Sequence, residues 1–181
     1  MDSANFTPRM KRTPAQINAL TAEEFTTLLG GVYEHSPWIA AAAAGQRPFA
    51  SLTALKAALR EAVDHAPEAA QLALILAHPD LAGKLARLGQ LTPESTREQA
   101  AAGMDAMSPE QVRTMTSANG AYREKFGFPF IICARRHTRD SILGSMAARL
   151  VNDAPTERAA ALEEIHHIAQ LRIDDLLCPE N

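Results

Sequence analysis

The apolar positions of this chain recur mainly with the three- and four-residue spacing of amphipathic helices. Residues 52–65 give the clearest example, because one face of the expected helix carries Leu52, Leu55, Leu59 and Val63. Ser51 can cap that helix at its start. An earlier helix is expected to begin at the capping box Thr21-Ala22-Glu23-Glu24 and to end at Gly30-Gly31.

Further helix starts are marked by a serine or threonine followed by proline, because the first residue can cap a helix and proline fits its first turn. Such pairs occur at Ser36-Pro37, Thr92-Pro93 and Ser108-Pro109. Gly127 ends the helix that begins at Ser108, and Pro67 opens a helix that ends at His78. Residues from about 139 to 151 and from 155 to 177 complete the set.

Two stretches depart from the helical pattern. Residues 128–133 read as a strand, but no other run can pair with them, so we expect a buried extended segment. Residues 1–13 are polar and charged without periodicity, which predicts a disordered arm. The remainder, residues 14–181, contains no repeat or linker. The pattern therefore predicts an all-α fold, a single-domain bundle of about eight to nine helices.

Composition narrows the class of protein. Hydrophobic residues make up 46% and aromatic residues 5% of the chain, which favours closely packed helices over sheets. The net charge of −3 is spread over both signs, so we expect no nucleic-acid partner. No apolar run approaches the ~20 residues that span a bilayer, and no secretory signal is present. Cys133 and Cys178 match no zinc spacing. We therefore expect a soluble cytoplasmic protein with reduced thiols and no membrane partner.

The first candidate for chemistry is His78, where an apolar helical run stops. Pro79 disfavours the α conformation at the residue before it and cannot donate a backbone hydrogen bond. The imidazole is therefore expected at the end of a buried helix, facing the space beyond it. A simple capping role, in which the histidine complements the helix dipole, is the alternative.

A polar helix face supplies the second candidate. Ser95, Glu98 and Gln99 follow one another at i, i+3 and i+4, so a hydroxyl, a carboxylate and an amide share one face. Together they could bind a polar ligand that offers both donors and acceptors, such as a urea or a hydantoin. An ordinary solvated face near a helix N-terminus is the alternative.

The third candidate is Arg172, which falls in the middle of the apolar stripe of the last helix. A buried guanidinium has to be paired, because an unpaired buried charge is very unfavourable. Its partner could be a core carboxylate with no catalytic role, a catalytic glutamate or an anionic substrate.

The remaining histidines and Cys133 carry weaker indications. His166 and His167 are adjacent and point about 100° apart on a helix, which is poor chelation geometry, so we expect a solvated face. Surface positions are expected for the other three, His35, His65 and His137. Cys133 lies in an apolar run without a neighbouring base, which indicates an inert buried thiol.

Four segments of the chain resemble the decarboxylases of 2-oxo-4-hydroxy-4-carboxy-5-ureidoimidazoline (OHCU), the last enzymes of the route from urate to (S)-allantoin. They are Ala77-His78-Pro79-Asp80-Leu81, Ser95-x-x-Glu98-Gln99-x-x-x-Gly103, Asn119-x-x-Tyr122-x-x-Lys125-Phe126-Gly127-Phe128-Pro129-Phe130-Ile131-Ile132 and Glu164-Ile165-x-x-Ile168-Ala169-x-x-Arg172. They occur in order with fitting spacings, within a resemblance that runs from Leu20 to Leu177. One departure is Ala82-Gly83, where the family pattern has a glycine nearer the leucine.

The resemblance implies an all-α homodimer that acts on a small ureido-imidazoline substrate with neither metal nor organic cofactor. It implies His78, Glu98 and Arg172 as catalytic residues, with His78 as general acid/base. Glu98 would orient His78 or bind the substrate, and Arg172 would pair with Glu98 or meet developing negative charge. The implied substrate contacts are Pro79, Ser95, Gln99, Phe130, Ile131, Ile132, Cys133 and Ala134.

Two other classes of function remain open. A metal-dependent amidohydrolase could use His78, Asp80 and the cluster at 163–167. A non-catalytic member of the same fold could bind a ureide or purine without turning it over.

Overall fold

The computed structural model describes residues 11–83 and 89–178. Within these ranges the chain forms nine α-helices, two short 3-10 helices and no β-strand, so the expected all-α class is confirmed. The α-helices are α1 Pro14–Asn18, α2 Ala22–Leu29, α3 Pro37–Ala44, α4 Leu52–Asp64, α5 Glu68–Ala77, α7 Pro93–Ala101, α8 Pro109–Phe126, α9 Arg139–Arg149 and α10 Ala154–Leu176. The 3-10 helices are η1 Met104–Ala106 and η2 Ala134–Arg136.

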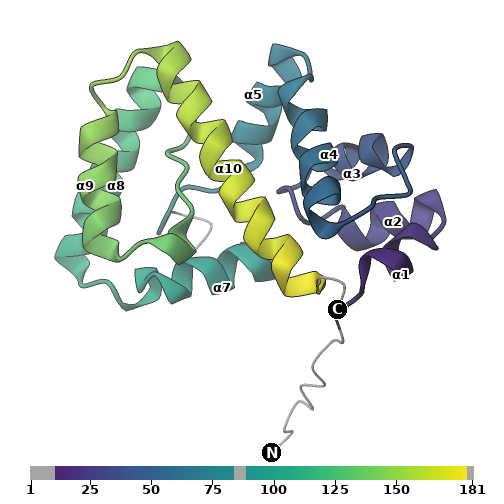
Figure 1. The fold of residues 1–181 in the computed structure, drawn as a ribbon. Helices are drawn as coiled ribbons and strands as arrows, with labels where there is room; N and C mark the ends of the chain where they lie inside the picture. The colour runs from purple at the N-terminus through teal and green to yellow at the C-terminus, as the bar shows by residue number, and fades with distance from the viewer. Residues whose placement is uncertain (1–10, 84–88, 179–181) are drawn as a thin grey trace, which may run out of the picture.

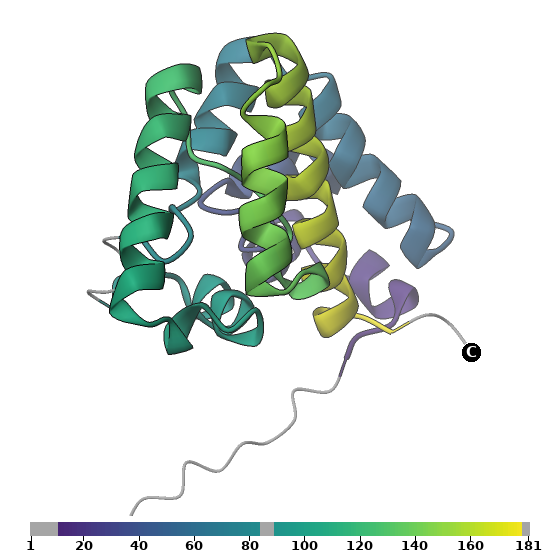
Figure 2. The same ribbon diagram turned by 90° about the vertical axis from the view of Figure 1, so that its left-hand side faces the viewer.

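Helix α10 crosses the middle of the molecule (Figure 1). Helices α1 to α4 lie on one side of it, and α8 and α9 lie on the other. A quarter turn brings α8 and α9 to the front, where they stand side by side with α10 behind them (Figure 2). Because α10 is central, its side chains can reach elements that are far apart in the sequence.

The helix ends follow the capping signals of the sequence. Thr21 with Glu24, and Ser108 with Gln111, form reciprocal capping boxes. Gly127 ends α8 in the left-handed conformation at φ 77°, which glycine adopts without a Cβ clash. Ser36 differs from the expectation, because it precedes α3 but its side chain makes no capping hydrogen bond.

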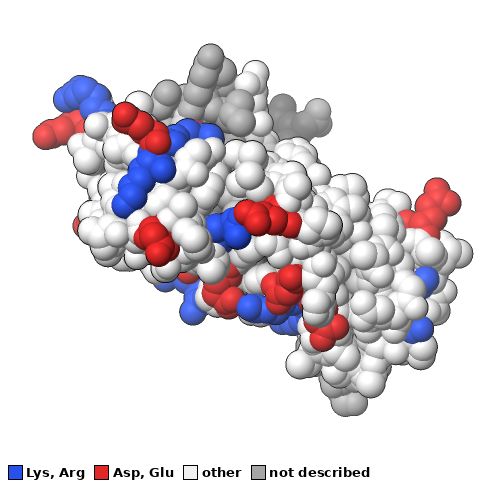
Figure 3. All heavy atoms as spheres, turned by 90° about the horizontal axis from the view of Figure 1, so that it is seen from above, with Lys and Arg blue, Asp and Glu red and all other residues white. Residues whose placement is uncertain are grey.

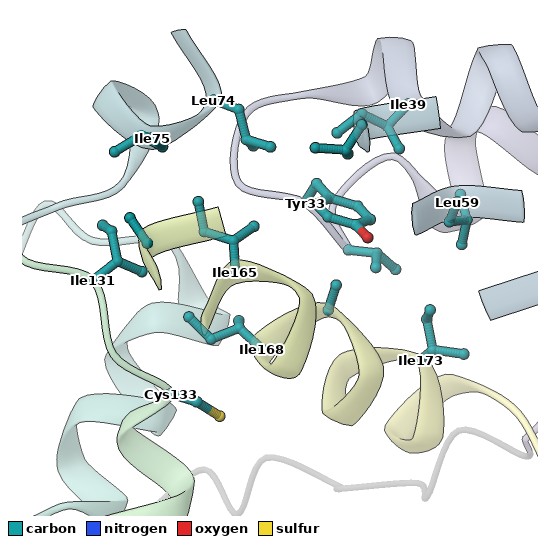
Figure 4. Packing of buried hydrophobic residues seen from close by; sticks show 14 of the residues in the cluster. Tyr33, Ile39, Leu59, Leu74, Ile75, Ile131, Cys133, Ile165, Ile168 and Ile173 are labelled. Atoms are coloured by element: carbon teal, nitrogen blue, oxygen red, sulfur yellow. The ribbon is translucent and has the colours of Figure 1, made fainter. Parts of the chain in front are cut away.

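The core lies around α10. Figure 4 shows three isoleucines of α10, Ile165, Ile168 and Ile173, among apolar side chains from both sides of the molecule, including Tyr33, Leu59, Leu74 and Ile131. On α3 the small side chains of Ala40 and Ala43 are fully buried, and this helix packs against α2 and α4. The abundant alanines therefore act as close-packing residues.

Residues 128–133 form the buried extended segment that the sequence indicates. Side chains of the last two helices hold its backbone in place of a partner strand. Arg149 Nη1 donates to the Ile131 carbonyl at 2.7 Å, and the Cys133 N–H donates to Glu164 Oε2 at 2.7 Å. The segment is thus fixed against α9 and α10.

The ends of the described chain meet. Residues 1–10 of the expected disordered arm lie outside the described residues. Residues 11–13, which we also assigned to that arm, are ordered. Arg12 forms a β-bridge with Leu177 through two backbone hydrogen bonds, of 3.1 and 3.0 Å, and Thr13 caps α1. The backbone groups of Arg12 are paired at the end of α10, and the polar composition of residues 1–13 gave no sign of this pairing.

In residues 11–83 and 89–178 no helix is long and apolar enough to cross a membrane. Acidic and basic side chains are interspersed on the face seen in Figure 3. This distribution matches the mixed charge pattern of the sequence.

A buried ion pair stabilises the side of the molecule that carries the extended segment. Glu157 at the start of α10 is completely buried. Its carboxylate accepts hydrogen bonds from Arg149 Nε at 2.8 Å, from Asn152 Nδ2 at 2.8 Å and from the Tyr122 hydroxyl. The same Arg149 lies over the Phe130 ring, 4.6 Å from its centroid, and so links the ion pair to the extended segment.

We expect Glu157→Ala to lower the free energy of unfolding by about 3–5 kcal/mol, because it leaves the Arg149 guanidinium without its buried partner. Glu163→Ala is the matched control on the same helix, since Glu163 pairs with Arg60 at a half-exposed position. Its loss should be about 0–1 kcal/mol. Urea unfolding followed by circular dichroism measures both, and equal losses would contradict this interpretation.

Candidate functional site

His78 is the residue at which α5 stops. Its backbone is extended at φ −78° and ψ 139°, as expected before Pro79. The side chain is 6% exposed, and Nδ1 lies 2.9 Å from the Leu74 carbonyl oxygen. A carbonyl oxygen can only accept, so Nδ1 carries the proton and Nε2 is the basic nitrogen of the neutral ring.

Burial lowers the pKa of His78 to about 4, although the Leu74 carbonyl and the Glu34 carboxylate oppose the shift. The imidazole is therefore neutral at pH 7. Its Nε2 is consequently unprotonated and able to accept a proton.

Helix α7 presents the polar face that the sequence indicates. Thr92 caps it by accepting from the Ser95 N–H at 3.2 Å, and Ser95 and Gln99 are buried. Gln99 Oε1 accepts from the Ala82 N–H at 2.9 Å. The helix face thereby holds the loop that follows His78.

That loop contains the departure from the family pattern. Ala82 has φ 49°, in the left-handed region that glycine adopts without strain. A glycine at position 82, between Leu81 and Gly83, would therefore fit this turn. Asn119 fixes the loop from α8 by donating to the Leu81 carbonyl at 2.9 Å.

Arg172 is 5% exposed and pairs with two carboxylates. Its Nε and Nη2 donate to the two oxygens of Glu98, both at 2.7 Å, and its Nη1 donates to Glu34 Oε2 at 2.8 Å. Burial alone would lower the pKa of Arg172, but the two glutamates outweigh it and raise that pKa. The buried guanidinium stays charged.

Glu34 is a residue that the sequence reasoning missed. It lies between α2 and α3 and is 2% exposed. Besides Arg172, it accepts from the Ser95 hydroxyl at 3.2 Å and from the Thr92 hydroxyl at 2.9 Å. Burial raises the pKa of this carboxyl, but Arg172 and these hydrogen bonds outweigh burial and lower it. The buried position of Arg172 requires a carboxylate, but no periodicity identifies Glu34 as that partner.

The residues to which the resemblance assigns catalysis or substrate contact all line one cavity of about 40 Å³. It is bounded by His78, Pro79, Ser95, Glu98, Gln99, Phe130, Ile131, Ile132, Cys133, Ala134 and Arg172. The sequence reasoning did not include the further lining residues Leu81, Arg135 and Ile168. A second hollow of about 420 Å³ shares Glu98, Arg135 and Arg172 with it. The structure thus brings the candidates together, whereas their individual roles stay predictions.

His166 corrects the sequence interpretation, because it is buried at 2% exposure rather than solvated. Its Nδ1 lies 2.9 Å from the Tyr33 hydroxyl, and its Nε2 lies 3.2 Å from Asp64 Oδ1. Neighbouring His167 is half-buried. The polar partners of His166 come from distant elements, which explains why the helix pattern alone gave the wrong environment.

The other weak candidates differ in their burial. His35 and His65 are exposed and His137 is half-buried. Cys133 is buried, and burial raises the pKa of its thiol to about 11, as expected for an inert thiol.

The acidic residues that the alternative of a metal-dependent amidohydrolase would use form ion pairs with different arginines. Asp80 pairs with Arg123, and Glu163 pairs with Arg60. Across the described ranges, no group of three or more histidine, cysteine, aspartate or glutamate side chains is arranged to hold a metal ion.

Comparisons with known proteins identify the family of this chain. The model of the OHCU decarboxylase family matches residues 18–174. The 2-oxo-4-hydroxy-4-carboxy-5-ureidoimidazoline decarboxylase of Amia calva is 42% identical over 165 residues, which cover 91% of this chain and 94% of the relative. The protein of the same name from Haloferax volcanii is 39% identical over 168 residues, covering 93% and 98%.

Solved structures show the same fold. A crystal structure of (S)-allantoin synthase has a TM-score of 0.74 and 26% identity, covering 92% of this chain and 54% of that chain. A crystal structure of an OHCU decarboxylase in the presence of (S)-allantoin has a TM-score of 0.65 and 24% identity, covering 85% and 96%.

The fold and the cavity define a helical protein in which an imidazole, a carboxylate and a guanidinium line one small cavity together with apolar side chains. The chain belongs to the OHCU decarboxylase family.

We expect His78 to titrate in the folded protein near pH 4. Because this pKa lies below the usual 6.5, protonation favours the unfolded chain. The contribution of His78 to the free energy of unfolding is therefore present above pH 6.5 and is lost as the pH falls toward 4. An NMR titration of the imidazole C–H resonance, assigned by its loss in His78→Asn, measures the pKa. A midpoint at 6.5 would contradict the burial argument.

Proposed function

We propose that this protein decarboxylates OHCU to (S)-allantoin in urate degradation, with His78 as general acid/base. The observation that carries the proposal is the single cavity that joins His78, Glu98 and Arg172 from three separate parts of the chain. The named relatives, each matched over nearly their whole length, supply the substrate class.

The substrate contains its own electron sink. Its carboxylate is attached to a carbon that also bears a hydroxyl and adjoins a ring C=N bond. When the carbon–carboxylate bond breaks, CO2 leaves and its electron pair moves into the ring, where the imine nitrogen accepts it. The residues of the cavity then have to bind the substrate, stabilise the intermediate and control one proton transfer.

His78 suits that proton transfer because its Nε2 is the basic nitrogen at pH 7. In the proposed sequence it accepts the proton of the substrate hydroxyl as a carbonyl forms. It then returns that proton to the neighbouring carbon on one face, which makes the product a single enantiomer. The ring nitrogen that received the electron pair takes one proton from solvent, which balances the loss of CO2 from a carboxylate. The imidazole ends the cycle in its starting form.

The other residues bind and orient the substrate. Glu98 pairs with Arg172, so we assign it to the ureido or hydroxyl group of the substrate rather than to His78. Ser95, Gln99 and backbone groups of residues 130–134 would bind the ureide and ring amides. The pocket contact of Pro79 would fix the position of the ring.

A cytoplasmic location and a homodimer are further parts of the proposal. Both rest on the resemblance to the family and on the composition of the chain. Sedimentation velocity should give twice the mass of one chain, and a monomer at micromolar concentration would contradict the dimer.

We expect the purified protein to accelerate (S)-allantoin formation when OHCU is generated in situ from urate by the two upstream enzymes. Circular dichroism of the product follows both its rate of formation and its chirality. His78→Asn should lower the rate by about 10²–10⁴-fold, because it removes the proton-transfer group. His65→Asn is the matched control, since His65 is exposed and does not line the cavity.

Racemic product at the spontaneous rate with the wild-type protein would overturn the proposed activity. Tight binding of (S)-allantoin without release of CO2 from fresh OHCU would instead identify a non-catalytic ureide-binding member. Full activity of His78→Asn would leave the activity standing but overturn the role of His78.

A further inference from the structure

The cluster of Glu34, Glu98 and Arg172 contains two carboxylates and one guanidinium. We propose that Glu34 is the permanent counter-ion and positioning residue of Arg172, so that Glu98 is free to exchange Arg172 for N–H groups of the substrate's ureido moiety. The exchange rests on the proposed function, whereas the part assigned to Glu34 can be tested without turnover.

The hydrogen bonds of Arg172 leave it little capacity for a substrate anion. A guanidinium has five N–H donors. Nε and Nη2 bind Glu98, and Nη1 binds Glu34 and lies 3.3 Å from the Gly31 carbonyl oxygen. The second Nη2 donor points to the Ser95 hydroxyl at 3.4 Å. Five acceptor contacts match the five donors, so Arg172 acts by holding its neighbours.

The two carboxylates have different surroundings. Glu34 is 2% exposed, receives hydrogen bonds from Arg172, Ser95 and Thr92, and is absent from the residues that line the cavity. The side chain of Glu98 is 13% exposed and borders both hollows. Each Glu98 oxygen accepts one hydrogen bond from Arg172, which leaves acceptor capacity on each oxygen. Glu98 can therefore meet a ligand, whereas Glu34 cannot.

The charge balance favours the same division. If Glu98 releases Arg172, the ion pair between Arg172 and Glu34 remains, and no unpaired guanidinium is left buried. Without Glu34, the same release would leave Arg172 unpaired, which is strongly unfavourable. Glu34 therefore makes it possible for Glu98 to change partners.

The loop that carries Glu34 is anchored to α10 through the residue before Glu34. His166 Nε2 lies against the Asp64 carboxylate, so it carries the proton, and Nδ1 accepts from the hydroxyl of Tyr33, the residue before Glu34. The residue after it, His35, has φ 46°, a left-handed conformation that non-glycine residues rarely adopt. The adjacent residues Tyr33 and Glu34 thus contact His166 and Arg172 of α10, and the Tyr33 contact helps to hold Glu34 at Arg172.

The decisive experiment is a double-mutant cycle between Glu34→Gln and Glu98→Gln, with kcat and KM measured on OHCU generated in situ. In Glu34→Gln, Glu98 has to stay on Arg172, so we expect kcat/KM to fall by about 10–100-fold. The double variant removes both carboxylate partners of Arg172, so its folding is checked by circular dichroism. The folded double variant should have a kcat/KM little below that of Glu34→Gln alone; if it does not fold, Glu34→Asp combined with Glu98→Gln takes its place. Multiplicative losses, or a Glu34→Gln variant within threefold of wild type, would overturn the proposal.

Glu157→Gln is the matched control for the loss of a buried carboxylate, because Glu157 also pairs with an arginine but makes no contact with Arg172. Its effect should multiply with that of Glu98→Gln. If Glu34→Gln does not fold, Glu34→Asp replaces it, because it keeps the charge. Its loss of kcat/KM should be smaller, and its effect should again not multiply with that of Glu98→Gln. Multiplicative losses with Glu34→Asp would equally overturn the proposal.

A spectroscopic readout separates this proposal from the proposed activity. The NMR signal of the Arg172 Nε–H reports its bond to Glu98, and saturating (S)-allantoin, with occupancy checked by calorimetry, should shift it in wild type but not in Glu34→Gln. Glu34→Gln should also lower the pKa of His78 in the free protein, since the Glu34 charge raises it. An unshifted Arg172 signal at full occupancy would overturn the exchange, and an unchanged His78 pKa would overturn the role of Glu34. Failure to turn over OHCU would affect the proposed activity alone.

Discussion

A guanidinium buried on the central helix has to be neutralised inside the protein, and this requirement joins the parts of the chain that build the site. Arg172 of α10 draws Glu34 from the loop after α2 and Glu98 from α7 into one cluster. Neither helix nor loop would bring a carboxylate to this depth without such a partner, because a buried charge is stable only when it is paired and hydrogen-bonded. The pairing thereby places Glu98 in the lining of the cavity that His78 also borders.

A second set of buried polar contacts shapes the opposite wall of the cavity. The extended segment has no partner strand, so its backbone depends on side chains from α9 and α10. Arg149 binds the segment and is itself held by the buried Glu157. The positions of backbone groups at residues 130–134 are consequently set by packing between helices rather than by a sheet. The segment that lines the cavity is thereby held in place without a partner strand.

The electrostatics of the cavity fit a reaction in which the substrate supplies the electron sink. Burial keeps His78 neutral, and its hydrogen bond to Leu74 selects the tautomer that presents a base to the cavity. Arg172 stays charged, but its donors are directed to protein acceptors. The proposed function therefore uses a neutral imidazole to carry the proton and a charged cluster to orient the substrate, which is what a stereospecific proton transfer needs.

The sequence by itself determined all the described α-helices except α1, because capping boxes, prolines and apolar periodicity are local signals that tertiary contacts here reinforce. It also identified His78 from the proline after it, and Arg172 from its place in an apolar stripe, since both arguments need only neighbouring residues. Tertiary structure alone decided that Glu34 is the second partner of Arg172 and that His166 is buried against Tyr33 and Asp64. These contacts join residues more than 100 positions apart, and a residue in an aperiodic loop carries no local sign of the partner that burial assigns to it.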